Sequence, residues 1–207
     1  MPSVRVAAAD LALFAAETVY AAGIPVVEIT MTVPGGIDVI SQLSRKHPDF
    51  IVGAGTVLDA ETARQCLDAG ARFLTSPGLV PEVLDYALKN DVVAIPGALT
   101  PSEVIVAWKA GADFVKIFPC AQMGGDRYIR ALKIPLPQVP LIASGGVNQL
   151  TAANFIFAGA SSLGIGSELM PKQALLKRQD QWIHELARRF IETIHNARVH
   201  MSGADED

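Results

Sequence analysis

Two charged residues stand inside stretches of the sequence that are otherwise apolar. Lys116 lies within Phe114-Val115-Lys116-Ile117-Phe118, and Glu28 lies within Val26-Val27-Glu28-Ile29. Both stretches have the composition of buried strands, in which side chains alternate between two faces. Because burial strips water from an ammonium group, it favours the neutral amine, which is the form that attacks a ketone carbon. Lys116 is therefore a candidate nucleophile; a lysine that only forms a structural ion pair is the alternative.

Glu28 is the candidate partner of that amine. A carboxyl group within reach of the lysine can move protons as a carbinolamine, an imine and an enamine form and break down, which contributes roughly 10²–10⁴-fold to a rate. The simpler alternative is that Glu28 only neutralises the charge of Lys116. Both hypotheses require the two side chains to face the same interior space.

A repeating pattern along the chain supplies the framework that could bring these residues together. Four helix-like segments end in Ala-Gly, at 22–23, 69–70, 110–111 and 158–159, and a short apolar strand follows each of them. A glycine just past a helix takes the left-handed conformation that satisfies the last carbonyls. The intervals are about twice the length of a βα unit, so one further strand is expected inside each.

The expected strands are short and almost entirely apolar, as in a parallel sheet covered on both faces. They fall at 3–6, 26–30, 50–54, 73–75, 92–96, 114–118, 141–144 and 163–165. An opening helix is expected over 8–21, and a final packing helix over about 182–197, where Trp182, Leu186, Phe190 and Ile194 recur at helical spacing.

This order of elements predicts an α/β fold, a (β/α)8 TIM barrel with a shortened first strand and a C-terminal packing helix. A doubly wound open sheet is the alternative, because the rhythm of the sequence does not by itself establish closure. We expect a single domain over residues 1–199. Residues 200–207 are acidic at their end and are expected to form a disordered tail.

Glycine-rich segments follow the last two expected strands. Ser144-Gly145-Gly146 precedes a helix expected to begin near Asn148, and Gly166-Ser167 precedes a short turn. Bare backbone amides and a helix N-terminus bind phosphate, and barrel enzymes place such sites at the carboxyl ends of their late strands. Plain tight turns are the alternative.

The composition excludes several classes of protein. The formal charge of −4, with 50% hydrophobic and 18% charged residues, argues against nucleic acid or a membrane surface as a partner. Cys66 and Cys120 form no C-x-x-C pair, which is typical of a reduced cytoplasmic protein. No apolar run is long enough to cross a bilayer.

No cofactor is expected from the sequence. The four histidines, His47, His184, His195 and His200, fall on expected helices or the tail and form no cluster of metal ligands, which argues against a zinc-dependent enzyme. The run Gly53-Ala54-Gly55 lacks the further glycine and the acidic residue of a dinucleotide-binding motif.

Six segments carry a resemblance to a known family: Val27-Glu28-Ile29-Thr30, Gly53-Ala54-Gly55-Thr56-Val57, Ser76-Pro77-Gly78, Ile95-Pro96-Gly97, Val115-Lys116-Ile117-Phe118-Pro119 and Ser144-Gly145-Gly146-Val147. From Arg5 to about Phe190 the chain resembles the 2-keto-3-deoxy-6-phosphogluconate (KDPG) / 4-hydroxy-2-oxoglutarate (KHG) aldolases. The second and fifth segments, at this separation, form the specific part of the pattern.

The resemblance implies a class I aldolase, a carbon–carbon lyase. It would cleave a 2-keto-3-deoxy-6-phospho sugar acid or 4-hydroxy-2-oxoglutarate to pyruvate and an aldehyde. Lys116 would form the Schiff base, and Glu28 would be the general acid and base, acting through a water. Thr56 would contact the carboxylate end of the pyruvyl group, while Phe118 and Pro96 would line the pocket.

The resemblance also implies that Gly145, Gly146 and Ser167 hold the phosphate group of the substrate, and Gly166 of the same glycine-rich segment is a further candidate for substrate binding. Members of the family are similar in needing no cofactor and in being soluble and typically trimeric. A small-molecule substrate and a cytoplasmic homotrimer are therefore expected.

The sequence departs from the family pattern at Thr32. Members that act on the gluconate substrate usually carry an arginine there, which binds the substrate carboxylate. The phosphogalactonate branch also lacks that arginine, and the segments 116–119 and 128–133 resemble that branch too. Arg5 stands where members often have an arginine that reaches the substrate, and it could compensate for Thr32.

Two other functions fit part of the pattern. A phosphate-binding barrel of another class, a sugar-phosphate isomerase or a thiamine-phosphate-synthase-like transferase, would use the glycine-rich segments and give Lys116 no covalent role. A catalytically silent phosphosugar-binding protein would use the same pocket, with Thr32 and the short first strand as signs of decay.

Overall fold

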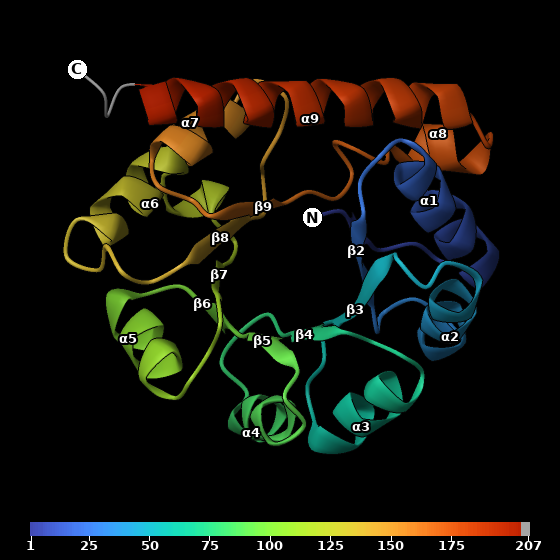
Figure 1. Cartoon of the computed structure of the whole chain (residues 1–207), viewed down its shortest axis with the longest axis horizontal. Coiled ribbons are helices and arrows are strands. Elements are labelled where there is room, and N and C mark those ends of the chain that lie inside the picture. The colour runs from blue at the N-terminus through green and yellow to red at the C-terminus, as the bar shows by residue number, and fades with distance from the viewer. Residues whose placement is uncertain (204–207) are drawn as a thin grey trace.

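The chain folds into a ring of parallel strands surrounded by helices (Figure 1). The structure is a computed structural model that describes residues 1–203. Its strands are β1 (Ser3–Val4), β2 (Val26–Thr30), β3 (Ile51–Gly55), β4 (Phe73–Thr75), β5 (Val93–Ile95), β6 (Gly97–Ala98), β7 (Val115–Ile117), β8 (Leu141–Ser144) and β9 (Ser162–Gly164).

Helices follow the strands in alternation and cover the outside of the ring. They are α1 (Ala9–Ala21), α2 (Gly36–Lys46), α3 (Ala60–Asp68), α4 (Pro81–Lys89), α5 (Pro101–Lys109), the 3₁₀ turn η1 (Ala121–Met123), α6 (Asp126–Lys133), α7 (Ala152–Phe157), α8 (Lys172–Leu176) and α9 (Asp180–Gly203). The long α9 lies against α1 and α7 and completes the outer layer (Figure 1).

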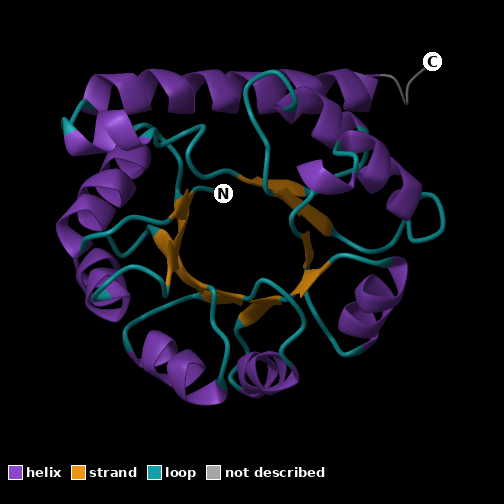
Figure 2. Cartoon of the chain, turned by 180° about the vertical axis from the view of Figure 1, so that it is seen from behind, coloured by secondary structure: helices purple, strands orange, loops and turns teal. Residues whose placement is uncertain are grey.

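The strands pair in two parallel sheets, β1 to β5 and β6 to β9. Between β5 and β6 stands Pro96, which has no N–H to donate, so these two short strands are the halves of one barrel strand. At the other junction, Ser3 N donates to Ile165 O at 2.9 Å and Ile165 N donates to Met1 O at 3.0 Å. Figure 2 shows the resulting ring. The predicted (β/α)8 barrel with its short first strand is confirmed, and the open-sheet alternative is wrong.

Two boundaries differ from the sequence-based expectation. Helix α9 continues to Gly203, so residues 200–203 are helical rather than a disordered tail; Arg198 donates to the carbonyl of Ser161 at 2.9 Å and holds this last part in place. Residues 204–207 lie outside the described residues. The helix expected near Asn148 begins at Ala152, because the Asn148 side chain accepts from Leu150 N and Thr151 N and forms a turn first.

The interior of the ring is built in layers. Its floor, at the amino ends of the strands, is an apolar cluster of Phe73, Ile95 and Ile142 packed with Met1, Val26 and Phe114. Because side chains two residues apart on a strand face the same side, the next layer up comes from the following inward positions. On five of these strands that position is polar: Ser3, Glu28, Thr75, Lys116 and Ser144. The fold therefore places this layer of polar side chains directly above the apolar cluster.

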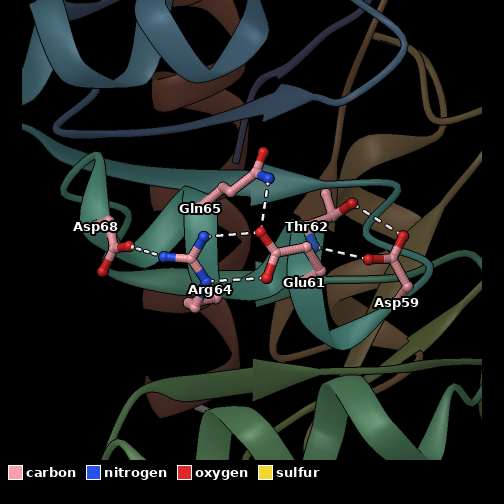
Figure 3. A network of polar contacts seen from close by, with 6 residues as sticks. All are labelled: Asp59, Glu61, Thr62, Arg64, Gln65 and Asp68. Carbon is pink, nitrogen blue, oxygen red and sulfur yellow. Dashed lines mark hydrogen bonds and ion pairs between the residues drawn. The ribbon is translucent and has the colours of Figure 1, made fainter.

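Helix α3 has a strong start signal that ends the loop after β3. Asp59 accepts from the backbone N of Thr62 at 2.7 Å and from its hydroxyl at 2.9 Å, which is the bonding pattern of a helix N-cap. Figure 3 shows this cap beside the exposed ion pairs of Arg64 with Glu61 and Asp68. Exposed pairs add little stability, so the cap is the feature that fixes the end of the loop carrying Thr56.

The close approach of the β4 loop to β6 gives a test of this packing. A Cβ at Gly97 would overlap the backbone of Pro77 and Gly78, which cannot swing aside as a flexible side chain can. We expect Gly97→Ala to lower the free energy of unfolding by about 1–3 kcal/mol, measured by denaturant unfolding. Gly78→Ala is the matched control, because its Cβ would meet nothing within 4 Å. Equal midpoints for the two variants would contradict this packing.

Candidate active site

An ion pair lies in the polar layer of the barrel interior. Lys116 Nζ, from β7, is 3.2 Å from Glu28 Oε2, from β2, on the other side of the ring (Figure 1). Lys116 is 7% exposed and Glu28 is 1% exposed. The two residues that the sequence singled out separately are thus brought together, and both lie on the floor of apolar side chains.

The carboxylate of Glu28 has two further donors. Ser3 Oγ donates to Oε1 at 2.6 Å, and Thr75 Oγ1 donates to Oε2 at 2.7 Å. With the amine of Lys116, three groups from three different strands surround the two carboxylate oxygens. Ser3 and Thr75 were not among the predicted site residues, because nothing in their local sequence marks an uncharged hydroxyl as the partner of a distant acid.

These contacts decide the charge of Glu28. Burial raises the pKa of its carboxyl group, but the positive charge of Lys116 and the hydrogen bonds from Ser3, Thr75 and Lys116 outweigh burial, so the pKa lies below its usual value of 4.5. The carboxyl is therefore ionised at neutral pH, which is the state that can accept a proton.

Strand β3 contributes space to the site. A Cβ at Gly53 would overlap the ring of Phe73 in the floor, and a Cβ at Gly55 would overlap the carboxyl group of Glu28 in the layer above. The two glycines, two residues apart and facing inward, therefore leave room for those larger side chains. Part of the Gly-Ala-Gly segment noted in the sequence has this steric role.

A cavity of about 860 Å³ opens above the ion pair, at the carboxyl ends of the strands. Lys116 forms part of its lining. Eight of the predicted site residues line it as well: Arg5, Thr32, Thr56, Phe118, Gly145, Gly146, Gly166 and Ser167. Ser3 also lines the cavity, whereas Glu28 does not, because Ser3 and Lys116 stand between its carboxylate and the open space.

Pro96 does not line this cavity. It borders a separate small space against α4, together with Val83 and Leu84. The alternation of side chains explains the difference: Ile95 points to the floor of the barrel, so Pro96, the next residue, points outward to the helices. The predicted place of Pro96 in the pocket is therefore corrected.

One end of the cavity presents bare backbone. Gly145 and Gly146 have φ of +87° and +83°, and a Cβ on Gly146 would overlap the side chain of Ala121. The N–H groups of Gly145, Gly146, Gly166 and Ser167 make no hydrogen bond to another of residues 1–203. Four such amides facing one space can bind an anion, and helix α7 begins only at Ala152.

Two cations stand at the cavity mouth. Arg5 and Lys172 line it, are exposed, and form no ion pair within the described part of the chain. Lys172 was not predicted, because nothing in the sequence of its turn shows which way it faces. Thr32 lies 2.8 Å, oxygen to oxygen, from Thr30. Glu168 is exposed and lines the cavity as well, so its carboxylate offsets part of this charge; the two cations still leave the mouth with a net positive charge, which suits a negatively charged substrate.

Thr56 has a conformation that its residue type disfavours. Its φ is +57°, in the left-handed region, which is rare for a β-branched residue and costs on the order of 1–3 kcal/mol. The cap of α3 and the bond from Val57 N to Thr75 O, at 3.1 Å, hold the loop on both sides of it. Strain kept in a residue that lines the cavity is typical of a functional position.

Other chemistry finds little support among the described residues. No group of three or more histidine, cysteine or acidic side chains within residues 1–203 is placed to hold a metal ion. Both cysteines are free, and burial raises the pKa of Cys66 and of Cys120 to about 12, so neither thiol is ionised at neutral pH. No helix in this part of the chain is long and apolar enough to cross a membrane.

Comparisons with a family model and with known sequences indicate the same family. The model of the KDPG and KHG aldolases matches residues 1–186. The 2-dehydro-3-deoxy-phosphogluconate aldolase of Pseudomonas aeruginosa is 32% identical over 187 residues, which cover 89% of this chain and 84% of that enzyme. The KHG/KDPG aldolase of Escherichia coli K12 is 31% identical over 192 residues, covering 93% and 90%.

Comparison with solved structures agrees. A native KDPGal structure superposes with a TM-score of 0.84 at 29% identity, covering 95% of this chain and 94% of that one. The KDPG aldolase of Legionella pneumophila, with pyruvate captured as a covalent carbinolamine, superposes with a TM-score of 0.80 at 31% identity, covering 90% and 92%.

The buried pair gives a prediction for stability and pH. Lys116→Met keeps the shape of the side chain but leaves the Glu28 carboxylate buried without its cation. We expect a loss of about 3–5 kcal/mol in unfolding free energy at pH 7. Because Glu28 has a lowered pKa, its charged form stabilises the fold above about pH 4.5, and that contribution is lost as the pH falls. The difference between variant and parent should therefore shrink in acid.

Denaturant unfolding at several pH values measures this effect. Glu28→Gln combined with Lys116→Met removes both charges and should recover part of the loss at pH 7. A loss in Lys116→Met that is the same at pH 7 and in acid would mean that the two groups are not coupled.

Proposed function

Since the chain belongs to the KDPG and KHG aldolase family, we propose that Lys116 and Glu28 carry its reaction. The protein is a class I aldolase, a carbon–carbon lyase that cleaves a keto-deoxy sugar acid to pyruvate and an aldehyde. Its substrates are small molecules. Family membership favours this activity over the isomerase and the transferase, and the trapping and turnover experiments below separate it from the silent binding protein. The observation that carries the proposal is the 3.2 Å contact between the amine and the carboxylate below the cavity.

The steps follow from the chemistry of the pair. Lys116 gives a proton to Glu28, and the neutral amine attacks the ketone carbon, C2, of the keto acid. The carbinolamine hydroxyl takes the proton back from Glu28 and leaves as water, which gives an iminium ion. This ion accepts the electron pair of the C3–C4 bond as the C4 hydroxyl loses its proton to the Glu28 carboxylate, so the aldehyde departs and an enamine remains. Protonation of C3 and hydrolysis then release pyruvate and restore the amine.

The walls of the cavity supply binding groups for both ends of the substrate. We assign the carboxylate of the pyruvyl unit to Thr56, whose loop is held at both ends, with Phe118 beside the reacting carbons; its ring centre lies 5.8 Å from Lys116 Nζ. The phosphate is assigned to the amides of Gly145, Gly146, Gly166 and Ser167, which have no partner within residues 1–203.

We further propose a galactonate-type acid as the preferred substrate. Thr32 stands where gluconate-acting members usually carry an arginine, and its hydroxyl is bonded to Thr30 at the cavity rim. Arg5, which follows the neighbouring strand β1, then supplies the cation for the substrate carboxylate. The superposition on the KDPGal structure supports the same branch.

A homotrimer in the cytoplasm is the proposed state of the protein. Large apolar side chains stay exposed on the surface, among them Ile134 at 78% and Leu150 at 89%. A designed porous cage made by fusing symmetric oligomeric domains contains a similar chain, with a TM-score of 0.87 at 27% identity, covering 99% of this chain and 75% of that one. The two free cysteines fit a reducing compartment.

Reductive trapping tests the nucleophile. Incubation with pyruvate and borohydride should add one reduced pyruvyl group to Lys116, located by peptide mass spectrometry. Lys116→Met should lose the adduct, whereas Lys177→Met, which changes an exposed lysine away from the cavity, should keep it. A folded, pyruvate-saturated protein with Lys116 unmodified would rule out the assignment.

A substrate panel tests the specificity. Galactonate-, gluconate- and hydroxyglutarate-type acids are compared by the rate of pyruvate release. We expect the highest kcat/KM for the galactonate type. The galactonate- and gluconate-type acids carry the same carboxylate and differ in configuration along the sugar chain, so the shape of the cavity must distinguish them. We expect Thr32→Arg, which restores the residue of gluconate-acting members at the cavity wall, to move the ratio toward the gluconate type by roughly tenfold, since such a change in a pocket is worth about 1–3 kcal/mol. A parent enzyme that prefers the gluconate type, with no change in Thr32→Arg, contradicts the proposal.

A further inference from the structure

The acid of the pair has no direct access to the cavity. Glu28 is 1% exposed and is not part of the cavity lining. Its Oε2 atom faces the amine of Lys116 and the hydroxyl of Thr75, and its Oε1 atom faces the hydroxyl of Ser3. A proton that moves between Glu28 and a substrate carbon must therefore pass through a group that touches both.

Ser3 is placed between the two. It lies opposite Glu28 in the pairing of β1 with β2, and it lines the cavity. Its backbone is fixed on both sides, because Ser3 N donates to Ile165 O at 2.9 Å and Glu28 N donates to Pro2 O at 2.8 Å. A hydroxyl carries one donor and two acceptor sites, so it can donate to Oε1 while it accepts from the cavity side.

The other hydroxyls of the polar layer lack one of these two properties. Thr75 donates to Glu28, but it is 1% exposed and does not line the cavity. Ser144 lines the cavity, but it makes no hydrogen bond to Glu28 within residues 1–203. Among the described residues, Ser3 is the hydroxyl that has both contacts.

We propose that the Ser3 hydroxyl relays protons between Glu28 and C3 of the lysine-bound substrate. The proposal rests on the Schiff-base function of Lys116. In the enamine-forming direction, Ser3 Oγ takes the proton from C3 as its own proton passes to Glu28 Oε1. The C–H electron pair becomes the C2–C3 double bond, and the iminium π pair moves to nitrogen. In the reverse direction each proton returns by the same path.

Hydrogen exchange on pyruvate isolates this step from aldehyde chemistry. In deuterium oxide the enzyme should exchange the methyl protons of pyruvate, followed by proton NMR. We expect Ser3→Ala to slow the exchange by roughly tenfold or more, within the range of general acid–base catalysis, at every pH. Borohydride trapping of pyruvate on Lys116 should remain. Ser3→Thr, which keeps a hydroxyl, should recover much of the exchange rate.

Thr75→Val is the matched control. It also removes one hydrogen bond from Glu28, but its hydroxyl lies away from the cavity. Because loss of a donor raises the pKa of Glu28, both Thr75→Val and Ser3→Ala should move the acidic limb of the exchange profile to higher pH. Once Glu28 is ionised, Thr75→Val should recover more of the parental rate than Ser3→Ala, because the Thr75 hydroxyl does not touch the cavity.

The outcomes separate the possible roles of Ser3. Recovery of the parental exchange rate by Ser3→Ala at high pH overturns the relay and leaves Ser3 as a residue that positions Glu28. If the parent protein does not trap pyruvate, the Schiff-base function is wrong, and the relay that rests on it is wrong as well. If Ser3→Ala does not fold, the ratio of exchange to trapping in Ser3→Gly decides the question, since glycine also lacks the hydroxyl and should lower that ratio.

Discussion

A buried, charged carboxylate is the feature on which this barrel interior depends. Burial alone would drive Glu28 to its neutral form, and the site keeps it ionised by surrounding it with the amine of Lys116 and the hydroxyls of Ser3 and Thr75. Each of these donors comes from a different strand, so the charge is compensated only when the strands have their full arrangement around the ring. The ionised state of the Glu28 side chain therefore depends on the arrangement of the whole ring of strands.

The layered interior explains how a small apolar protein can keep such a group. The floor excludes water from below, and the two-residue period of the strands turns the next inward positions into the site. Space is made by glycine on β3, where any side chain would collide with Phe73 or Glu28. At the opposite end, strained or left-handed backbone at Thr56 and at the paired glycines replaces side chains as the binding surface.

The sequence predicts the parts of this design that are local and periodic. The barrel, most strand positions, and the pairing of Lys116 with Glu28 follow from rhythm and from charges placed in apolar strands. The sequence does not identify Ser3 as a site residue, because its strand is only two residues long and shows no alternation of polar and apolar side chains. The family resemblance predicts Pro96 in the pocket, whereas the alternation of side chains along its own strand turns it outward. The turn at Asn148 and the extension of α9 to Gly203 depend on side-chain contacts that the spacing of residues does not encode.

The two charged residues belong to different sheets, Glu28 to the one running from β1 to β5 and Lys116 to the one running from β6 to β9. Neither half-barrel holds both, so an isolated half would keep an ion without its counter-ion. The ion pair therefore exists only where both groups of strands are in place. For this protein, turnover then reports that the whole ring of strands is assembled, and not one part of it alone.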